Sequence, residues 1–126
     1  MKRFLPVLLL SLCAGCIAPA TDGVSVDQGR LTVESPSFAT RIELVQFQTK
    51  RIEGDFLKVQ VSLRNRDTRD FTCQYHFTWK DADGMTIKAA ETVWKPLPLH
   101  GREEAVLEAV CPVPGAADFR LVVRPL

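Results

Sequence analysis

This sequence has no excess of charge of either sign, since its 126 residues include 16 lysines and arginines and 15 aspartates and glutamates. Binding to nucleic acid needs Lys and Arg concentrated on one face, and the chain has no basic run that would form such a face. Histidine is also scarce, since only His76 and His100 occur, so too few ligands are present for a metal site. The composition therefore excludes nucleic acid as a partner and predicts neither a metal nor another cofactor.

Catalytic motifs are equally scarce. No serine stands in a Gly-x-Ser-x-Gly motif, and Ser35 and Ser37 flank Pro36 in what is predicted to be a turn. The adjacent carboxylates Glu103 and Glu104 would point to opposite sides of a strand, so they are not placed to act as an acid–base pair. We therefore predict that the protein is not an enzyme.

Long hydrophobic runs are limited to one, which lies at the N-terminus. Lys2 and Arg3 precede an apolar stretch over residues 4–12, and two small residues then stand directly before Cys16. This is the layout of a secretory signal peptide, and the apolar stretch is too short to span a hydrocarbon core about 30 Å thick. We predict that residues 1–15 are a signal peptide, which is removed on export.

The end of this segment resembles the lipobox of bacterial lipoproteins. Its residues Cys13-Ala14-Gly15-Cys16 match the small pair before the cysteine, although Cys13 stands where leucine is usual. The resemblance implies a diacylglycerol on the thiol of Cys16, which becomes the first residue of the mature protein. Several acyl chains hold a protein durably at a membrane. Ile17, in place of the aspartate that retains lipoproteins at the inner membrane, implies the outer membrane, with the domain facing the periplasm.

The next residues are predicted to be a lipidated, flexible tether. Residues 16–29 are small and polar and contain Pro19, Gly23 and Gly29, which is typical of a linker rather than of a core element. The remaining residues, 30–126, are numerous enough for one domain with a single core.

A period of two in hydrophobicity dominates residues 30–126. The clearest cases are residues 57–63, where Leu and Val alternate with polar residues, and residues 71–79, where aromatic residues share one face with Cys73. The aromatic residues predicted to lie in the core are Phe71, Tyr75, Phe77 and Trp79. Further strands are predicted at residues 42–47, with a bulge where the parity changes, and at residues 86–94, 105–111 and 119–123.

Turn residues separate these strands, at residues 65–67, 83–84, 96–101 and 112–115. Several short antiparallel strands at this spacing predict an all-β fold, an immunoglobulin-like antiparallel β-sandwich. An open barrel is the alternative architecture.

Two segments resemble the YcfL family of small periplasmic lipoproteins, whose domain has no known function. One is Thr72-Cys73-Gln74-Tyr75-His76-Phe77-Thr78-Trp79-Lys80-Asp81-Ala82-Asp83-Gly84, preceded by the strand end at residues 61–65, and the other is Leu31-Thr32-Val33-Glu34-Ser35-Pro36. The similarity covers residues 27–126. It implies a fold and a cellular location, and it supplies no catalytic residues.

Cys73 and Cys111 are the only cysteines left once the lipobox is set aside. The oxidising periplasm favours disulfides, so we predict a bond between them, provided that their strands are neighbours. Two buried free thiols are the alternative.

A proline-rich segment is the candidate contact surface. It contains Trp94, Pro96, Leu97, Pro98 and Leu99, whose leucines we expect to be exposed, although an ordinary loop over the end of the sandwich is the alternative. We predict a tethered interaction module that binds an envelope protein or a cell-wall component through this segment or through an edge strand. The alternative function is a small-ligand or metal-binding periplasmic protein, or an enzyme, whose site forms only in the fold.

Overall fold

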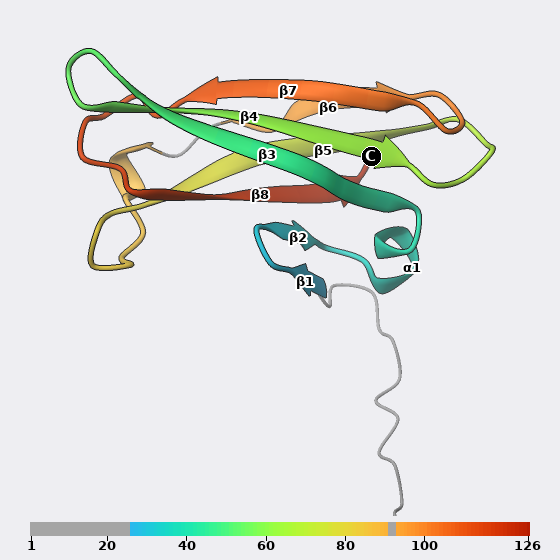
Figure 1. Cartoon of the computed structure of the whole chain (residues 1–126). Helices are drawn as coiled ribbons and strands as arrows, with labels where there is room; N and C mark the ends of the chain where they lie inside the picture. The colour runs from blue at the N-terminus through green and yellow to red at the C-terminus, as the bar shows by residue number, and fades with distance from the viewer. Residues whose placement is uncertain (1–25, 91–92) are drawn as a thin grey trace, which may run out of the picture.

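Two β-sheets packed face to face make up the protein in the computed structural model, which describes residues 26–90 and 93–126 (Figure 1). One sheet has five strands, in the order β1 (Val26–Gln28), β2 (Leu31–Val33), β8 (Asp118–Pro125), β5 (Phe71–Lys80) and β6 (Lys95–Leu99). The other has three, in the order β3 (Ile42–Ile52), β4 (Phe56–Asn65) and β7 (Glu104–Val110). Paired strands are antiparallel except β2 and β8, which are parallel. The predicted all-β sandwich is confirmed.

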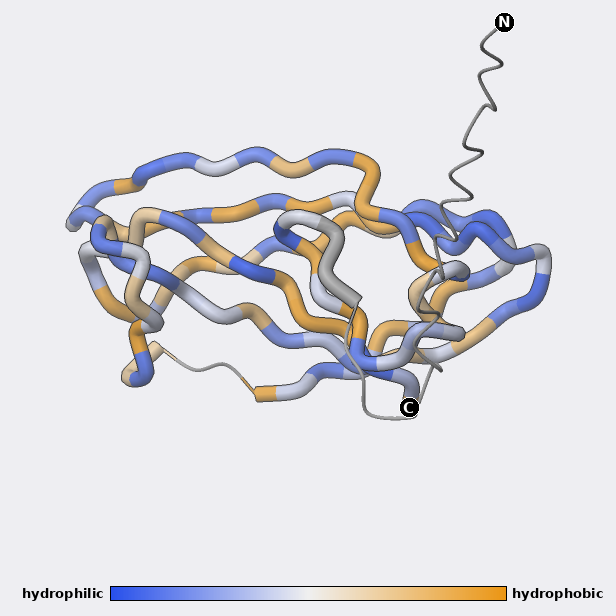
Figure 2. Tube along the Cα trace, turned by 90° about the horizontal axis from the view of Figure 1, so that it is seen from below, coloured by the Kyte–Doolittle hydropathy of each residue, from blue (hydrophilic) through white to orange (hydrophobic). Residues whose placement is uncertain are grey.

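The core lies between the two sheets and follows the predicted alternation. The inward side chains of β4 and β5 are buried, namely Leu57, Val59, Val61, Leu63, Cys73, Phe77 and Trp79. Phe71 and Tyr75 are partly buried and pack against this cluster. Figure 2 shows how hydrophobic and hydrophilic residues alternate along the strands. The packing that stabilises the domain thus lies within residues 31–123.

Strand β3 contains the bulge that the change of parity predicts. Its register with β4 shifts between Leu44 and Gln46. A bulge bends a strand and increases its twist, and residues 45–51 of β3 are exposed whichever way they point. Phe47 still reaches the core, since its ring centroid lies 5.4 Å from that of Phe119.

Two predicted boundaries near residue 95 are wrong. In the part of residues 86–94 that the structure describes there is no strand, because Thr86 makes only an isolated bridge with Lys80 and a 3-10 helix, η1 (Lys88–Ala90), follows. This helix places Ala90 in the core, where it is fully buried. The predicted turn at residues 96–101 instead contains most of β6, because an edge strand tolerates proline where the nitrogen faces away from its partner.

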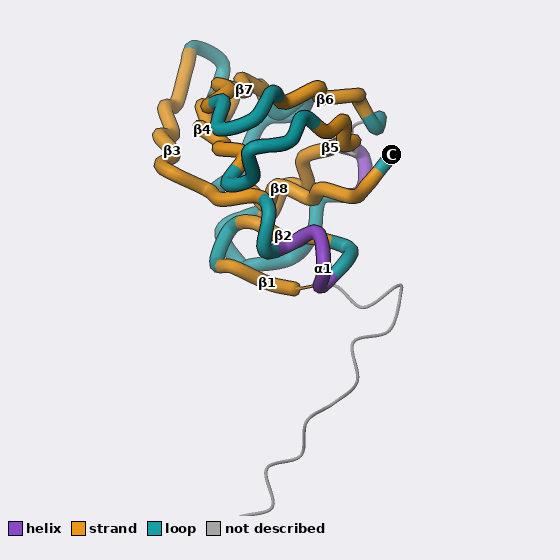
Figure 3. Tube along the Cα trace, turned by 90° about the vertical axis from the view of Figure 1, so that its right-hand side faces the viewer, coloured by secondary structure: helices purple, strands orange, loops and turns teal. Residues whose placement is uncertain are grey.

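The first strand begins inside the range predicted to be a tether. β1 pairs with β2 through a turn at Gly29, whose φ of 71° favours glycine, so the last residues of 16–29 belong to the five-stranded sheet. The predicted turn at Pro36 is a single helical turn, α1 (Pro36–Ala39). The Ser35 hydroxyl caps it by accepting a hydrogen bond from the Phe38 N–H at 3.4 Å. Figure 3 shows α1 close to β2.

Candidate functional site

The predicted lipid attachment at Cys16 lies outside the residues that the structure describes, as do the predicted signal peptide and most of the tether. Within residues 26–90 and 93–126, no helix is long and apolar enough to cross a membrane. Lipidation at Cys16 therefore stays a prediction from the sequence.

Cys73 and Cys111 do not form the predicted disulfide. Both are fully buried free thiols, and they belong to different sheets, because Cys73 lies on β5 whereas Cys111 directly follows β7. The Cys73 thiol donates instead to the carbonyl oxygen of Leu97, with Sγ and O 3.6 Å apart. Burial away from water raises the pKa of Cys73 to about 11.

The two thiols also lie toward opposite ends of the sandwich. The N–H of Cys111 donates to the carbonyl of Leu57, near the end where Ala117 donates to Lys80, the last residue of β5. Cys73 lies roughly 23 Å from Lys80 along that strand. A disulfide needs Cα atoms within about 7 Å of each other. Alternation along the strand correctly predicts that Cys73 faces the core, and the alternative of two buried free thiols is what the structure shows.

The predicted contact segment forms the edge strand β6 rather than a loop. It pairs with β5 on one side only, with Leu97 opposite Cys73 and Leu99 opposite Phe71. Leu97 is partly buried and Leu99 is 1% exposed, so both leucines pack against the core. The expectation that they are exposed is wrong, because opposite residues of paired strands share a face and Cys73 points inward.

Pro96 and Pro98 occupy the alternate positions of β6 and are exposed. Proline has no N–H, so in a paired strand both nitrogens face away from β5. The free edge of β6 consequently lacks two of the donors that an added strand would need. A partner can recognise this edge through its side chains, but strand addition is disfavoured.

Trp94 completes a stack of three side chains on the outer face of the five-stranded sheet. The Trp94 ring centroid is 4.2 Å from that of His76. The guanidinium carbon of Arg124 lies 3.9 Å from the Trp94 ring centroid and makes a cation–π contact with this ring. Arg124 is held in turn by Gln74, whose side-chain oxygen accepts from Nε at 2.9 Å. Trp94, His76 and Arg124 together form what is named here the Trp94 stack.

Trp94 belongs to the contact surface predicted from the sequence, whereas the other two members of the stack do not. His76 carries a usable signal, because its parity on the strand is opposite to that of the inward Phe77. Arg124 carries none, because only the pairing of β8 with β5, in which Arg124 stands opposite Gln74, brings it to this face.

The second histidine, His100, lines an open hollow of about 300 Å³ with Asp70 and Thr72. Its Nδ1 lies 3.4 Å from Asp70 Oδ2, and the two side chains are 74% and 72% exposed. The Gly101 N–H, which donates to Asp70 at 2.8 Å, lowers the pKa of Asp70, and His100 lowers it further. The His100 and Asp70 side chains are thus both largely exposed to solvent. Among the described residues no group of three or more His, Cys, Asp and Glu could hold a metal ion.

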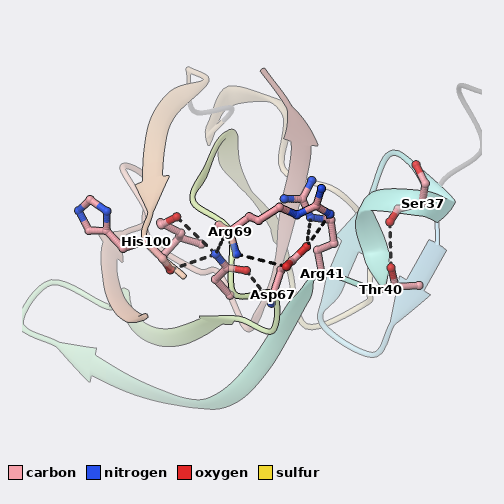
Figure 4. A network of polar contacts seen from close by, with 8 residues as sticks. Ser37, Thr40, Arg41, Asp67, Arg69 and His100 are labelled. Carbon is pink, nitrogen blue, oxygen red and sulfur yellow. Dashed lines mark hydrogen bonds and ion pairs between the residues drawn. The ribbon is translucent and has the colours of Figure 1, made fainter. Parts of the chain in front are cut away.

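A separate polar site lies where β4 runs into β5, and it centres on the buried Asn65 (Figure 4 shows the surrounding network). The Asn65 amide nitrogen donates to the carbonyls of Arg69 and His100, at 2.8 and 3.0 Å. Its oxygen accepts from the N–H of Asp67 at 2.9 Å. One side chain thus joins the β4–β5 loop to the β6–β7 turn.

Asp67 extends this network to two arginines. Its Oδ2 lies 3.0 Å from the Arg69 guanidinium and 3.3 Å from Arg41 Nε. The hydrogen bond from the Arg69 side chain lowers the pKa of Asp67 to about 2, and the Arg69 backbone N–H adds to this effect. Asp67 is therefore a carboxylate at any pH at which the protein works.

A polar hollow of about 270 Å³ lies beside this carboxylate. Its lining consists of Thr40, Arg41, Arg66, Asp67, Thr68 and Arg102. This hollow could not be predicted from the sequence, because three segments that are far apart in the sequence contribute to it. No motif within any one segment marks it.

Comparison with known proteins identifies a family but no function. A family model described as "Protein of unknown function (DUF1425)" matches residues 29–125. Among solved structures, a DUF1425 family member from Shewanella sp. pv-4 is 28% identical with a TM-score of 0.59, over 89% of this chain and 97% of that one. The Campylobacter jejuni protein cj0090 is similar in fold at 22% identity and a TM-score of 0.64, over 79% of this chain and 100% of that one. No curated protein matches the sequence.

Proposed function

The chain belongs to the DUF1425 family of proteins of unknown function, and from that premise we propose that it is a lipid-anchored, non-catalytic interaction module of the bacterial cell envelope. The resemblance to an uncharacterised family is confirmed at the level of DUF1425, and membership of the YcfL proteins within it is part of the proposal. Two features support the function. The sequence before residue 26 supplies the anchor, and the Trp94 stack supplies the contact surface.

The anchor rests on Cys16 and on the small residues before it. We expect Cys16→Ser to abolish the acyl mass of the mature protein, as measured by mass spectrometry of the purified protein. Cys13→Ser is the matched control, because Cys13 leaves with the signal peptide and its loss should change nothing. A normal lipid mass on the Cys16→Ser protein would contradict the anchor. The outer-membrane location rests on Ile17, so Ile17→Asp should retain the protein at the inner membrane.

The observation that carries the contact surface is the Trp94 stack. Trp94 is only partly buried, yet His76 and Arg124 hold its ring in place without any partner. Tryptophan and arginine are enriched among the residues that dominate binding energy, and a side chain that is already ordered loses less entropy on binding. Pro96 and Pro98 continue this surface along β6, and proline has little side-chain freedom to lose.

The partner that we propose is an envelope protein or a cell-wall component. It is recognised through side chains on the outer face of the five-stranded sheet, because the prolines disfavour strand addition at the β6 edge. A partner surface with an apolar group for Trp94 and a hydrogen-bond acceptor for Arg124 fits this face best.

A non-catalytic role agrees with the settings of the two histidines. The hollow next to His76 measures only about 30 Å³, which is room for about one or two water molecules. His100 and Asp70 stand in open solvent. The hollow at His76 is too small for a ligand, and the hollow of about 300 Å³ at His100 is open to solvent rather than enclosed. An enzyme or a small-ligand carrier therefore has less support than an interaction module.

Photo-crosslinking in cells from defined positions tests the contact surface. A photoreactive phenylalanine analogue replaces the exposed Pro96, next to the Trp94 stack, or the exposed Gln60, on the outer face of the other sheet. We expect a reproducible envelope partner from position 96 and not from position 60. Adding Trp94→Ala should remove that partner, whereas Trp94→Phe, which keeps a ring for Arg124, should retain most of it.

The Trp94→Ala protein needs a stability control, because a misfolded domain would also lose its partner. Trp94 lies outside the buried core, so its free energy of unfolding should change by less than about 1 kcal/mol. Crosslinks that are identical from positions 96 and 60, or that survive Trp94→Ala, would reject the Trp94 stack as the binding surface.

A further inference from the structure

We propose that the hollow lined by Arg41, Arg66 and Arg102 is a binding site for a phosphate group. The hollow measures about 270 Å³ and lies at the end of the sandwich opposite the β3–β4 turn. It shares no residue with the Trp94 stack. The site is therefore additional to the contact surface, and the binding of phosphate does not depend on the proposed anchor.

Arg41 is held in place before any ligand arrives. Its guanidinium carbon lies 4.8 Å from the ring centroid of Phe71 and 5.9 Å from that of Phe38. Its Nε is 3.3 Å from Asp67 Oδ2 but is buried without a hydrogen-bond partner. Arginine stacked on aromatic rings keeps its fork of N–H donors free for an anion. The buried Nε therefore faces Asp67, and the donors that Arg41 can offer to an anion in the hollow are those of its terminal NH2 groups.

Backbone hydrogen bonds fix the other two arginines relative to Arg41. The N–H of Arg66 donates to the carbonyl of Arg41 at 2.8 Å, and the N–H of Arg102 donates to the carbonyl of Asp67 at 2.9 Å. Asn65 ties together the same two loops. Three cationic residues from separate segments are consequently brought to one hollow by a rigid frame, and this is the pre-organisation that an anion site requires.

Arg102 stands out in its backbone conformation. Its φ is 64°, in the left-handed region that favours glycine over a branched or long side chain. Its side chain makes no ion pair or hydrogen bond with the described residues. This conformation closes the turn in which the Glu103 N–H donates to the carbonyl of His100 at 3.0 Å, and it lets the Arg102 N–H reach the carbonyl of Asp67. Here it keeps a guanidinium at the rim of the hollow.

The charges around the hollow leave a positive excess. The basic groups are Arg41, Arg66, Arg69 and Arg102, and the acidic groups are Asp67 and Glu43. Arg69 pairs with Asp67 at 3.0 Å, whereas Glu43 is only a loose neighbour of Arg66 at 4.0 Å. Three guanidinium groups that approach from different elements suit a tetrahedral phosphate, which offers more oxygen atoms than a planar carboxylate.

The position of the hollow favours one source of phosphate. Val26, at the start of the described chain, pairs with Val33, two residues before the Ser35 cap of α1, and α1 runs directly to Thr40 and Arg41. The chain therefore enters the fold at the end where the hollow lies. With the proposed lipid anchor at Cys16, residues 16–25 tether this end of the domain to the membrane, and these ten residues can reach at most about 35 Å. The headgroup of an anionic phospholipid is then the nearest phosphate; this choice of source rests on the proposed function.

An NMR titration with inorganic phosphate tests the site. It uses the mature chain from residue 16 with Cys16→Ser, which contains the whole core of residues 31–123. We expect saturable shifts of the Arg41 Nε–H and of the N–H groups of Thr68 and Arg102. Arg102→Gly should weaken binding at least about tenfold, the effect of losing one charge-assisted contact. Its unfolding midpoint should stay the same or rise, because glycine suits the left-handed conformation.

Arg64→Gln is the matched control. Arg64 lies on β4 at the same end and pairs with Glu104 at 3.0 Å, outside the hollow. It should change phosphate affinity less than about twofold, as expected for one distant, screened charge. Shifts that do not saturate, or equal losses in Arg102→Gly and Arg64→Gln, would overturn the site in favour of unspecific charge attraction.

Vesicles distinguish the two sources of phosphate. The same anchorless chain is added to phosphatidylcholine vesicles that contain about one fifth phosphatidylglycerol, and sedimentation measures binding. Binding that Arg102→Gly removes supports the lipid headgroup. Phosphate binding without vesicle binding supports a soluble phosphate ester. Vesicle binding that Arg102→Gly leaves intact overturns the lipid as the ligand of this hollow. Because the chain carries no lipid, failure of the anchor would leave these results unaffected.

Discussion

Gly101 packs directly against the carbonyl group of Thr68, so closely that any Cβ at residue 101 would collide with it. The contact presses the β6–β7 turn onto the β4–β5 loop. Next to it, the N–H of Arg102 donates to the carbonyl of Asp67. Glycine is required here because of the space available rather than because of its φ, and the position of the arginine hollow depends on that close approach.

Gly101→Ala should lower the free energy of unfolding by about 1–3 kcal/mol, the usual effect of overpacking. Urea denaturation followed by tryptophan fluorescence measures it. The control is Gly115→Ala, where no atom lies within 4 Å and only the φ of 89° opposes alanine, so the effect should be about 1 kcal/mol. If Gly101→Ala is no more harmful than Gly115→Ala, the close contact has been misjudged.

Asn65→Ala should destabilise the domain by about 3 kcal/mol. The substitution removes a fully buried side chain and takes away the partner of the Arg69 carbonyl and of the Asp67 N–H, while the His100 carbonyl keeps the N–H of Glu103. Thermal unfolding by circular dichroism checks this. Gln60→Ala, which removes an exposed bond to Glu108, should cost less than about 0.5 kcal/mol. Equal effects would mean that Asn65 is not the link between the two loops.

The regular part of the fold could be predicted from the sequence because burial alone determines it. Strict alternation over residues 57–63 and 71–79 identifies β4 and β5, and the change of parity near Val45 identifies the bulge of β3. β6 is missed because two prolines in five residues are typical of a turn. Only the order of strands in the sheet shows that β6 is an edge, where proline is tolerated.

The sites could be predicted only in part, since they depend on contacts between distant segments. The aromatic Trp94 is recognisable by itself, but Arg124 meets it only through the pairing of β5 with β8. Arg41, Arg66 and Arg102 share a hollow only because two loops and the end of α1 meet. The alternation of side chains along a strand likewise shows which face of the strand a cysteine occupies, but it does not show in which sheet or at which end of the sandwich that cysteine lies. The predicted disulfide is wrong for this reason.

Trp79→Ala should destabilise the domain by about 3–5 kcal/mol, as for other buried large side chains. Trp79 is 0% exposed and stacks on Phe77 with ring centroids 5.8 Å apart. Its Nε1–H is buried without an acceptor among the described residues. Trp79→Phe should therefore cost much less, because it keeps a ring and removes the unpaired donor. A loss below about 1 kcal/mol for Trp79→Ala in urea unfolding would place this face at the surface.

Both cysteines should react as free thiols once the protein unfolds. In the folded Cys16→Ser chain neither thiol should react quickly at pH 8, because both are buried and a pKa of about 11 leaves Cys73 almost entirely protonated. In denaturant without reductant, a chromogenic thiol reagent should detect Cys73 and Cys111 in every chain. Detection that requires prior reduction would show that the two cysteines had formed a disulfide after all.

Asp67 should make the domain less stable in acid. The pKa of Asp67 is about 2 in the folded protein and about 3.8 in the absence of the fold, so its contribution to stability is fully present above pH 4 and is lost as the pH falls toward 2. The largest cause of the lowered pKa is the hydrogen bond that the Arg69 guanidinium donates to the Asp67 carboxylate. The free energy of unfolding, measured by urea titration between pH 5 and pH 2, should therefore fall less steeply for Asp67→Asn than for the unaltered protein.

Arg69→Gln separates this ion pair from the other contacts of Asp67. It removes the strongest hydrogen bond to the carboxylate but leaves the Arg69 backbone N–H in place. The pKa of Asp67, followed by NMR of its side-chain carbon, should rise toward 3.8, and the acid sensitivity should fall accordingly. Since the pair is exposed, salt should weaken it in the unaltered protein and change little in Arg69→Gln. If the pKa of Asp67 stays near 2 in Arg69→Gln, the backbone N–H groups of Arg69 and Thr68, rather than the Arg69 guanidinium, hold the carboxylate ionised.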